Sequence, residues 1–370
     1  MMTIQNLYQL AVAGVQQLVP YVPGKPIEEL QRELGLERVV KLASNENPLG
    51  PSKKALTAMQ KALPELALYP DGSGFNLKNA LAKKFGVDPV QITLGNGSNE
   101  ILELVARAFL APGLNAVFSQ HAFAVYPIVT QAAGAASIVA PAVHYSHDLP
   151  AIRERINAQT RVVFIANPNN PTGTLLSQSH LEDFIKSLPA SCICVLDEAY
   201  YEFVPRKGEQ DSVEWLGQCP NLVIARTFSK AYGLAGLRVG YCMSSPEMAD
   251  ILNRVRQPFN NNSLALAAAE AALDDSEHLQ NTIKNNALGM KQLTEGFKNL
   301  GLSWIPSAGN FVSVDLSEPA YLVYEALLRK GVIVRPVANY EMPNHLRISI
   351  GTQGENHFFL QALTECLNNV

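Results

Sequence analysis

Short apolar runs alternate with segments of helical periodicity between about residue 90 and residue 260 of the chain. This alternation is typical of βαβ units, in which a mostly parallel sheet is covered by helices on both faces. The pattern therefore predicts an α/β fold whose seven-stranded central sheet has strands at Gln91–Leu94, Ala116–Phe118, Ser137–Val139, Val162–Ala166, Ile193–Leu196, Leu222–Ala225 and Val239–Met243.

Three further segments have helical features. Ser179 and Glu182 have the spacing of a capping box, which predicts that a helix begins at Ser179. An alanine-rich stretch from Ser263 is expected to continue as a long helix to about Leu300 and to bridge to a smaller α+β domain. Residues 7–19 form a moderately apolar run, but no Lys or Arg precedes it and glutamines interrupt it, so it does not have the pattern of a signal peptide. We expect an amphipathic helix or arm there instead.

Length and composition fit a two-domain globular protein. The chain has 370 residues, of which 47% are apolar and 17% charged, enough to bury a large core. We expect an N-terminal arm with part of the small domain at 1–45, a large domain at 46–275 and a small C-terminal domain at 276–370.

Charge and cysteine usage exclude several classes of partner. The net charge of -4 and the pI near 6.0 give no electrostatic reason to expect nucleic acid or an anionic membrane as a partner. No apolar stretch is long enough to span a bilayer. The five cysteines have no C-x-x-C spacing, so we expect reduced, mostly buried thiols in a cytoplasmic protein.

Lys230 is the first candidate for chemistry. It follows the apolar run Leu222–Ala225 and precedes Val239–Met243, so it lies at a strand end among residues that mostly bury. A buried ammonium is costly, and lysine avoids that cost through a lowered pKa or by forming a Schiff base. The position therefore favours carbonyl chemistry, and an ordinary surface lysine is the alternative.

Two other predicted strands also end in polar residues. The run from Ile193 delivers Asp197 at the carboxyl end of its strand, where ligands bind in open α/β sheets. The run from Val162 leads into an Asn/Pro/Gly turn that contains Asn170. An aspartate after a strand is also typical of metal and nucleotide sites, so these strand ends alone leave the chemistry open.

Taken in order, these motifs resemble a known family. Asn170-Pro-Thr-Gly, Asp197-x-x-Tyr200 and Ser229-Lys230 with Arg238 are similar to the signature of the fold-type I pyridoxal-phosphate-dependent aminotransferases. The resemblance extends over nearly the whole chain, and residues 21–26, 41–51 and 69–72 resemble the histidinol-phosphate aminotransferase branch. It implies the fold-type I architecture, a large domain that binds pyridoxal 5'-phosphate, and a homodimer with shared active sites.

The resemblance also implies roles for the central residues. Lys230 would hold the cofactor covalently and move the proton between substrate and cofactor. Asp197 would pair with the pyridinium nitrogen, while Asn170 and Tyr200 would hydrogen-bond the phenolic oxygen. The expected catalytic residues are thus Lys230, Asp197 and Tyr200. The alternatives are a helix N-cap for Asp197, a turn residue for Asn170 and a core aromatic for Tyr200.

A glycine-rich turn is expected to bind the cofactor phosphate. Residues 93–100 follow a strand and precede a helical pattern, so backbone N–H groups and the positive end of a helix would face the anion. A plain strand-to-helix turn is the alternative. By resemblance the cofactor contacts also include an aromatic ring against the cofactor face and a tyrosine from the neighbouring subunit, giving the set Gly97, Ser98, Asn99, Phe123, Thr227, Ser229, Arg238 and Tyr69. Many members of the branch have tyrosine where this chain has Phe123.

Substrate contacts are inferred from the same resemblance. Histidinol phosphate has a phosphate and no α-carboxylate, whereas glutamate brings two carboxylates to the same pocket. Arg347 resembles the C-terminal anion-binding arginine of the family, and Arg335 matches a second one in this branch. Tyr21 would cap the pocket from the N-terminal arm, and Asn47 is a further expected substrate contact. Arg335 is otherwise an ordinary edge-strand arginine, and no metal is expected.

Three functions are compatible with the sequence. The first is transfer of the amino group of L-histidinol phosphate to 2-oxoglutarate, giving imidazole-acetol phosphate and L-glutamate in histidine biosynthesis. The second is an aromatic or broad-specificity aminotransferase, because the cofactor motifs barely constrain the substrate pocket. The third is an aminotransferase-like ligand-binding regulatory domain, which the intact Lys230, Asp197 and Arg238 disfavour. A nicotinamide dehydrogenase is disfavoured because residues 95–100 lack the third glycine of the dinucleotide fingerprint.

Overall fold

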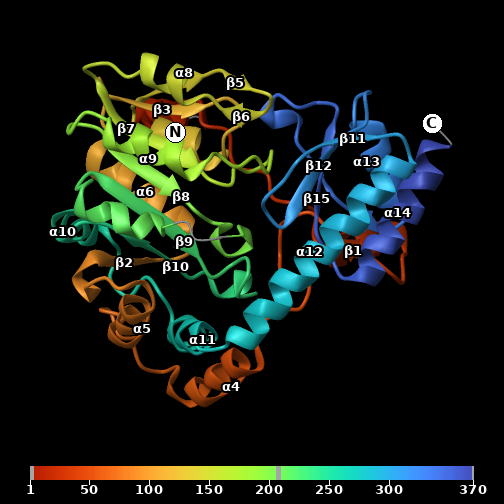
Figure 1. Ribbon diagram of the computed structural model, residues 1–370, viewed down its shortest axis with the longest axis horizontal. Helices are drawn as coiled ribbons and strands as arrows, with labels where there is room; N and C mark the ends of the chain where they lie inside the picture. The colour runs from red at the N-terminus through yellow and green to blue at the C-terminus, as the bar shows by residue number, and fades with distance from the viewer. Residues whose placement is uncertain (1–3, 206–209, 369–370) are drawn as a thin grey trace.

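The fold is built around a seven-stranded sheet. The computed structural model describes residues 4–205 and 210–368. The sheet has the order β2-β10-β9-β8-β7-β3-β4, and β10 runs antiparallel to both of its neighbours while the other pairs are parallel (Figure 1). Its strands are β2 (Ile92–Gly95), β3 (Asn115–Ser119), β4 (Ala136–Ala140), β7 (Thr160–Ala166), β8 (Ile193–Asp197), β9 (Leu222–Thr227) and β10 (Gly240–Met243). The seven predicted strands are confirmed, with ends that differ by at most two residues.

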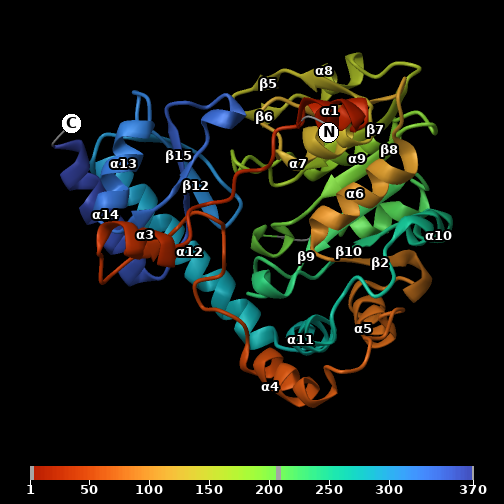
Figure 2. The ribbon, with the colours of Figure 1, turned by 180° about the vertical axis from the view of Figure 1, so that it is seen from behind.

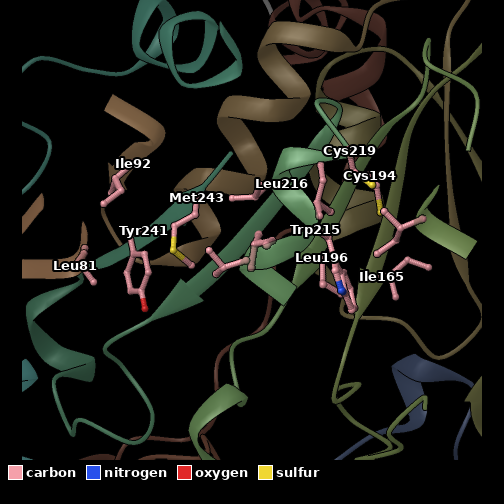
Figure 3. Close-up of a cluster of buried hydrophobic side chains, with 14 of the residues drawn as sticks. Leu81, Ile92, Ile165, Cys194, Leu196, Trp215, Leu216, Cys219, Tyr241 and Met243 are labelled. Atoms are coloured by element: carbon pink, nitrogen blue, oxygen red, sulfur yellow. The ribbon is translucent and has the colours of Figure 1, made fainter. Parts of the chain in front are cut away.

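Both faces of this sheet are buried, which explains the continuous apolar runs. Along β7, Val163 and Ile165 join one buried cluster, and Val162 and Phe164 join the other, as the two-residue period of a strand requires. Figure 3 shows part of the first cluster, in which side chains from the sheet pack with Trp215. The helices that contribute side chains to this first cluster are α4 (Lys53–Ala62), α5 (Phe75–Phe85), α8 (Leu149–Glu154), α9 (Gln178–Lys186) and α11 (Ser263–Leu273). The second cluster is covered by α6 (Ser98–Phe109), α7 (Val125–Ala132) and α10 (Pro246–Val255).

The C-terminal part packs around a smaller antiparallel sheet. This sheet has the order β11-β12-β15-β14, with β11 (Ser303–Ile305), β12 (Phe311–Asp315), β14 (Arg335–Pro336) and β15 (His345–Ser349). The helices beside it are α12 (Ser276–Asn299), α13 (Tyr321–Arg329) and α14 (Gln353–Leu367). The long α12 runs from the region of α4 and α11 to this second sheet (Figure 1).

The N-terminal segment is divided between the two parts of the molecule. The strand β1 (Val40–Lys41) pairs in parallel with β13 (Val332–Ile333), and α3 (Ile27–Leu34) lies beside the C-terminal helices (Figure 2). Val40 and Leu42 join the buried cluster of the C-terminal part. The segments α1 (Ile4–Leu10) and α2 (Ala13–Gln16) instead lie on the side of the larger sheet. The expected amphipathic segment is therefore two short helices.

Two helix predictions need correction. The helix α9 begins at Gln178 with Ser177 as its N-cap, so the start predicted at Ser179 is wrong. Glu182 pairs with Lys186 one turn later, at 2.7 Å, so it does not return to a capping box. The long helix from Ser263 is interrupted, because Asp275 accepts a hydrogen bond from the backbone N–H of His278 and starts α12.

Shorter elements complete the described chain. A hairpin joins β5 (Ala142–Val143) to β6 (Ser146–His147). The 3₁₀ turns are η1 (Leu63–Glu65), η2 (Pro89–Gln91), η3 (Tyr201–Phe203), η4 (Ser212–Gly217), η5 (Ala235–Leu237) and η6 (Ala338–Tyr340). All five cysteines are buried free thiols. In residues 4–205 and 210–368, no helix combines the length and the apolar character needed to cross a bilayer.

Candidate active site

One cavity collects most of the predicted site residues. It has a volume of about 340 Å³ and lies between the carboxyl ends of the central strands and the smaller antiparallel sheet. This is the end of a parallel sheet at which α/β proteins bind ligands. The predicted residues that line it are Tyr21, Ser98, Asn99, Phe123, Asn170, Asp197, Tyr200, Thr227, Ser229, Lys230, Arg238, Arg335 and Arg347.

Lys230 follows the end of β9 and points its amine at the N-terminal segment. Its Nζ donates a hydrogen bond to the carbonyl oxygen of Ser44, 2.9 Å away. Burial lowers the pKa of Lys230 to about 7, and the positive charges of Arg347 and Arg238 act in the same direction. A substantial fraction of this amine is therefore neutral near pH 7, which is the form that attacks a carbonyl group.

Asp197 ends β8 and receives hydrogen bonds from neutral donors. The hydroxyl of Tyr126 donates to Oδ2 over 3.0 Å, and the backbone N–H of Ala199 donates to Oδ1 over 3.2 Å. Burial raises the pKa of Asp197 to about 6, because little water reaches the charged carboxylate. A cationic group bound in the cavity would stabilise this carboxylate and lower its pKa again.

Asn170 and Tyr200 each keep a hydrogen-bond donor for a ligand. The Oδ1 atom of Asn170 accepts a hydrogen bond from Arg347 Nη1 at 2.5 Å, so its side-chain NH₂ is the remaining donor. The hydroxyl oxygen of Tyr200 accepts a hydrogen bond from Asn45 Nδ2 at 2.9 Å. Burial raises the pKa of Tyr200 to about 12, so the phenol keeps its proton at neutral pH.

The start of α6 forms a cradle for an anion. Gly97 is its N-cap, with φ of 77°, and Arg238 lies so close that a Cβ on Gly97 would be 2.3 Å from its Nη2. The guanidinium of Arg238 also donates to Ser229 Oγ over 3.3 Å. Backbone N–H groups at a helix start together with an arginine make a site for phosphate. Gly97 does not itself line the cavity, but it allows this approach.

Asn47 does not line the cavity of its own chain, and its expected substrate contact stays a prediction. Its Nδ2 donates to the carbonyl oxygen of Ala231 and to Thr282 Oγ1, over 2.9 and 3.0 Å. Its Oδ1 accepts from the backbone N–H of Leu49 at 3.0 Å. The side chain therefore fastens the N-terminal segment to the residue after Lys230 and to α12.

Tyr69 also lies away from the cavity of its own chain. It stacks on Phe259, with ring centroids 4.7 Å apart, and 82% of its surface is exposed. The expected contribution of Tyr69 to the site of a neighbouring subunit stays a prediction.

Two residues that contact the candidate site residues were not predicted from the sequence. Asn45 lines the cavity and bonds Tyr200, although it belongs to the segment 41–51 that carried the resemblance. Tyr126 bonds Asp197 from α7 and is fully buried. The hydroxyl of a buried tyrosine usually has a hydrogen-bond partner, but the amino-acid sequence does not show which residue that partner is.

Comparisons with known proteins agree with this geometry. The family described as aminotransferase class I and II matches residues 37–363. The chain belongs to this family. The aminotransferase is 62% identical over 364 residues to histidinol-phosphate aminotransferase 2 of Pseudomonas fluorescens, covering 98% of each chain. It is 61% identical to the protein of the same name from Pseudomonas aeruginosa, covering 98% of this chain and 99% of the relative.

A solved structure has the same fold as this aminotransferase. Histidinol-phosphate aminotransferase from Sinorhizobium meliloti, in complex with pyridoxal-5'-phosphate, has a TM-score of 0.91 and 30% sequence identity. The match covers 97% of this chain and 98% of the other. The predicted fold class, a fold-type I α/β architecture with a mostly parallel seven-stranded sheet, is confirmed.

Proposed function

We propose that this pyridoxal-phosphate-dependent aminotransferase transfers the amino group of L-histidinol phosphate to 2-oxoglutarate, a step of histidine biosynthesis. The observation that carries the proposal is that Arg335 and Arg347 line the same cavity as Lys230. The two arginines are register partners on the neighbouring strands β14 and β15. A substrate with a dianionic phosphate next to its reacting amine matches two guanidinium groups beside a nucleophilic lysine. The names of the Pseudomonas relatives support the same substrate.

The residues present fit pyridoxal 5'-phosphate. The cradle around Gly97 is so narrow that Arg238 leaves no room for a Cβ there, while its donors suit the phosphate. Asp197 lacks a bonded cation in the described residues, and a protonated ring nitrogen would supply one. When bound, the cofactor supplies a carbonyl for amine exchange and a ring that withdraws electrons from the substrate carbon.

Each of the central residues has a defined task in this proposal. Lys230, whose pKa burial lowers to about 7 in the free site, would hold the cofactor through its carbonyl group and would take and return the proton at the substrate carbon. Asp197 holds the proton on the ring nitrogen. Asn170 and Tyr200 donate to the phenolic oxygen. Phe123 packs edge-on against Tyr126, with ring centroids 5.9 Å apart, and would cover one face of the cofactor ring.

The substrate end of the cavity has unused hydrogen-bonding capacity. Arg347 is 6% exposed and donates to Asn170 and to the Ala43 carbonyl, while its Nε has no partner among the described residues. Arg335 is held by the Val22 carbonyl oxygen at 2.8 Å and lies 5.5 Å from the ring centroid of Tyr21. Tyr21, which belongs to the N-terminal arm, thus lies beside the two arginines and would cap a bound substrate.

We also propose a cytoplasmic homodimer with shared sites, in which Tyr69 reaches the phosphate cradle of the second copy. The large exposure of Tyr69 and its position outside its own cavity support this assignment. The five free, buried thiols support a reducing compartment. We also propose the domain division expected from the sequence, with an N-terminal arm and part of the small domain at 1–45, a large domain at 46–275 and a small domain at 276–370. It is supported by the pairing of β1 with β13, which joins the N-terminal segment to the C-terminal part, and by the position of the larger sheet between these two strands in sequence.

Half-reactions of the purified protein test the substrate. The holoenzyme is mixed anaerobically with histidinol phosphate, tyrosine, phenylalanine or aspartate, and the absorbance change of the cofactor is followed. Histidinol phosphate is expected to react with the highest kcat/KM of the four. A larger value for tyrosine or phenylalanine would replace the proposal with an aromatic aminotransferase.

Arg335→Ala is expected to weaken use of histidinol phosphate about 10- to 100-fold in kcat/KM, because a charge-assisted hydrogen bond contributes about 1.5 to 3 kcal/mol. Phenylalanine and tyrosine carry one carboxylate, which Arg347 can hold alone, so their kcat/KM should change much less. Arg329→Ala, at an exposed arginine of α13, is the control. Equal losses for both classes of substrate on Arg335→Ala would contradict a phosphate contact.

Gly97→Ala is expected to weaken cofactor binding about tenfold or more, because the added Cβ displaces Arg238 and a charge-assisted hydrogen bond to the phosphate contributes about 1.5 to 3 kcal/mol. The positive φ at this position lowers the stability of the variant but does not itself change its affinity. Equilibrium dialysis of the apoprotein with pyridoxal phosphate measures the affinity. Gly113→Ala is the matched control, since Gly113 has φ of 88° but nothing within 4 Å of its Cβ position. It should lose stability and keep the wild-type affinity. Cofactor affinity within twofold of wild type in Gly97→Ala would contradict the cradle.

A further inference from the structure

Three consecutive residues of the N-terminal segment contact three functional side chains. The carbonyl oxygen of Ala43 accepts from Arg347 Nη2 at 2.6 Å. The carbonyl oxygen of Ser44 accepts from Lys230 Nζ at 2.9 Å, and Asn45 Nδ2 donates to Tyr200 Oη over 2.9 Å. Only the third of these contacts is made by a side chain, so it depends on which residue occupies that position.

Asn45 is held rigidly from several directions. It is 1% exposed and has a φ of 55°, a left-handed conformation that asparagine and aspartate tolerate better than most residues. Its backbone N–H donates to Ser349 Oγ at 2.7 Å, and its carbonyl oxygen accepts from Asn310 Nδ2 at 2.9 Å. The side-chain amide therefore has little freedom to turn away from Tyr200.

The hydrogen bonds to Ser349 decide which end of the amide faces Tyr200. The backbone N–H of Asn45 can only donate, so Ser349 Oγ accepts there and has its own proton to give. That proton goes to Asn45 Oδ1 at 2.9 Å, and within the described residues Ser349 Oγ bonds to no residue other than Asn45. The oxygen end of the amide thus faces Ser349, and the NH₂ end faces Tyr200.

We propose that Asn45 is a positioning residue that occupies a lone pair of the Tyr200 hydroxyl and so directs its hydrogen toward the phenolic oxygen of the cofactor. The inference rests on the proposed function, because it uses the cofactor contact of Tyr200. An NH₂ group cannot accept a proton, so the tyrosine hydrogen must be donated elsewhere. A carboxylate in the place of the amide would do the opposite, because it would attract that hydrogen away from the cofactor.

The readout is the pH at which the absorbance of the lysine-bound cofactor changes. The Tyr200 hydroxyl, as a donor, stabilises the negative charge on the phenolic oxygen of the cofactor. This effect is largest when the nitrogen that links Lys230 to the cofactor has lost its proton, so the Tyr200 donor lowers the midpoint. Loss of the hydrogen bond from Tyr200 to the cofactor therefore raises the pH midpoint. A charge-assisted hydrogen bond of about 1.5 to 3 kcal/mol corresponds to a rise of about one to two pH units.

The experiment is a double-mutant cycle on the holoenzyme. Asn45→Asp keeps the size and the tolerance of positive φ, and Asn45→Gly removes the donor without adding charge. Each is measured in the wild-type and in the Tyr200→Phe background. Asn45→Asp is expected to raise the midpoint by about one to two pH units beside Tyr200, because the carboxylate draws the hydroxyl hydrogen away from the cofactor. Asn45→Gly is expected to raise it by a smaller amount, because the hydroxyl can still donate but is no longer directed. They should raise it much less beside phenylalanine, where only the charge of the aspartate still acts.

Asn310→Ala is the matched structural control. It removes the hydrogen bond to the Asn45 carbonyl oxygen and leaves the contact between Asn45 and Tyr200 in place. Its melting temperature is expected to fall while its midpoint stays that of the wild type. A shift in Asn310→Ala as large as in Asn45→Gly would assign the effect to loosening of the segment and overturn the inference.

Two other outcomes separate this inference from the proposed function. If Tyr200→Phe raises the midpoint but the Asn45 variants shift it equally in both backgrounds, the role of Asn45 is refuted and the cofactor contact stands. If Tyr200→Phe leaves the midpoint unchanged, the cofactor contact of Tyr200 is itself wrong and the inference falls with it.

Discussion

Lys230→Ala is expected to abolish turnover, with a loss of more than about 10⁴-fold, because it removes both the amine that binds the cofactor and the acid–base group. The geometry gives the reason: burial lowers the pKa of Lys230 to about 7 in a cavity that also contains Asp197 and Arg238. Cofactor should still bind to the variant through Arg238 and Asp197. Steady-state kinetics and dialysis measure the two effects separately.

Borohydride reduction identifies the lysine independently of turnover. Reduction of the wild-type holoenzyme should fix the cofactor to one peptide, the one that contains Lys230, and the variant should remain unlabelled. Lys78→Ala is the control, since burial also lowers the pKa of Lys78 but this residue lies outside the cavity. It should keep its activity and its label. Label on any other lysine of the wild-type protein would refute the site.

Asp197→Asn is expected to reduce turnover by about 10³- to 10⁴-fold, because a neutral amide does not hold a proton on the ring nitrogen. The fold should survive, since the amide oxygen can still accept from the backbone N–H of Ala199, and the amide NH₂ can donate to the hydroxyl oxygen of Tyr126. Activity within about tenfold of the wild type, a barrier change of about 1.4 kcal/mol, would contradict the role.

The pH dependence of cofactor binding gives the second measurement on Asp197. Burial raises the pKa of this carboxyl to about 6 in the free site, so it is charged above that pH and neutral below it. Affinity of the apoprotein for the cofactor should therefore weaken as the pH falls through about 6, and Asp197→Asn should lack this step. Glu198→Gln is the contrast, because Glu198 is buried beside Asp197 but pairs with Arg226 at 2.7 Å. It should lose stability and keep the pH step.

The sequence predicted the central sheet because its strands are buried on both faces. Val162–Ala166 is a continuous apolar run for this reason, whereas β7 starts two residues earlier at the polar but buried Thr160. The pairing of Val40 with Val332 could not be foreseen, because a two-residue strand has no pattern of its own and its partner lies far away in the chain.

In the candidate site, residues that belong to a local motif were predicted, and contacts between residues far apart in the chain were not. Asp197 ends a strand, and Lys230 and Asn170 lie in the turns just after strands, within recognisable motifs, so their place in the cavity was predicted. Asn45 and Tyr126 were missed because their partners, Tyr200 and Asp197, are 155 and 71 residues away in the chain. Asn47 was assigned from its motif alone, and its partners Ala231 and Thr282 are 184 and 235 residues away in the chain.

The pairing of β1 with β13 has a consequence for synthesis of the protein on the ribosome. The chain emerges N-terminus first, so Val40 and Lys41 leave the ribosome long before Val332 and Ile333 can pair with them. In the folded chain the residues that follow this pairing include Ala43 and Ser44, whose carbonyl groups lie beside Arg347 and Lys230. A nascent chain that extends only to the end of the larger sheet at Met243 still lacks Arg335 and Arg347 of the candidate site. A messenger truncated before the codon for Arg347 should yield no activity, however well the preceding residues fold.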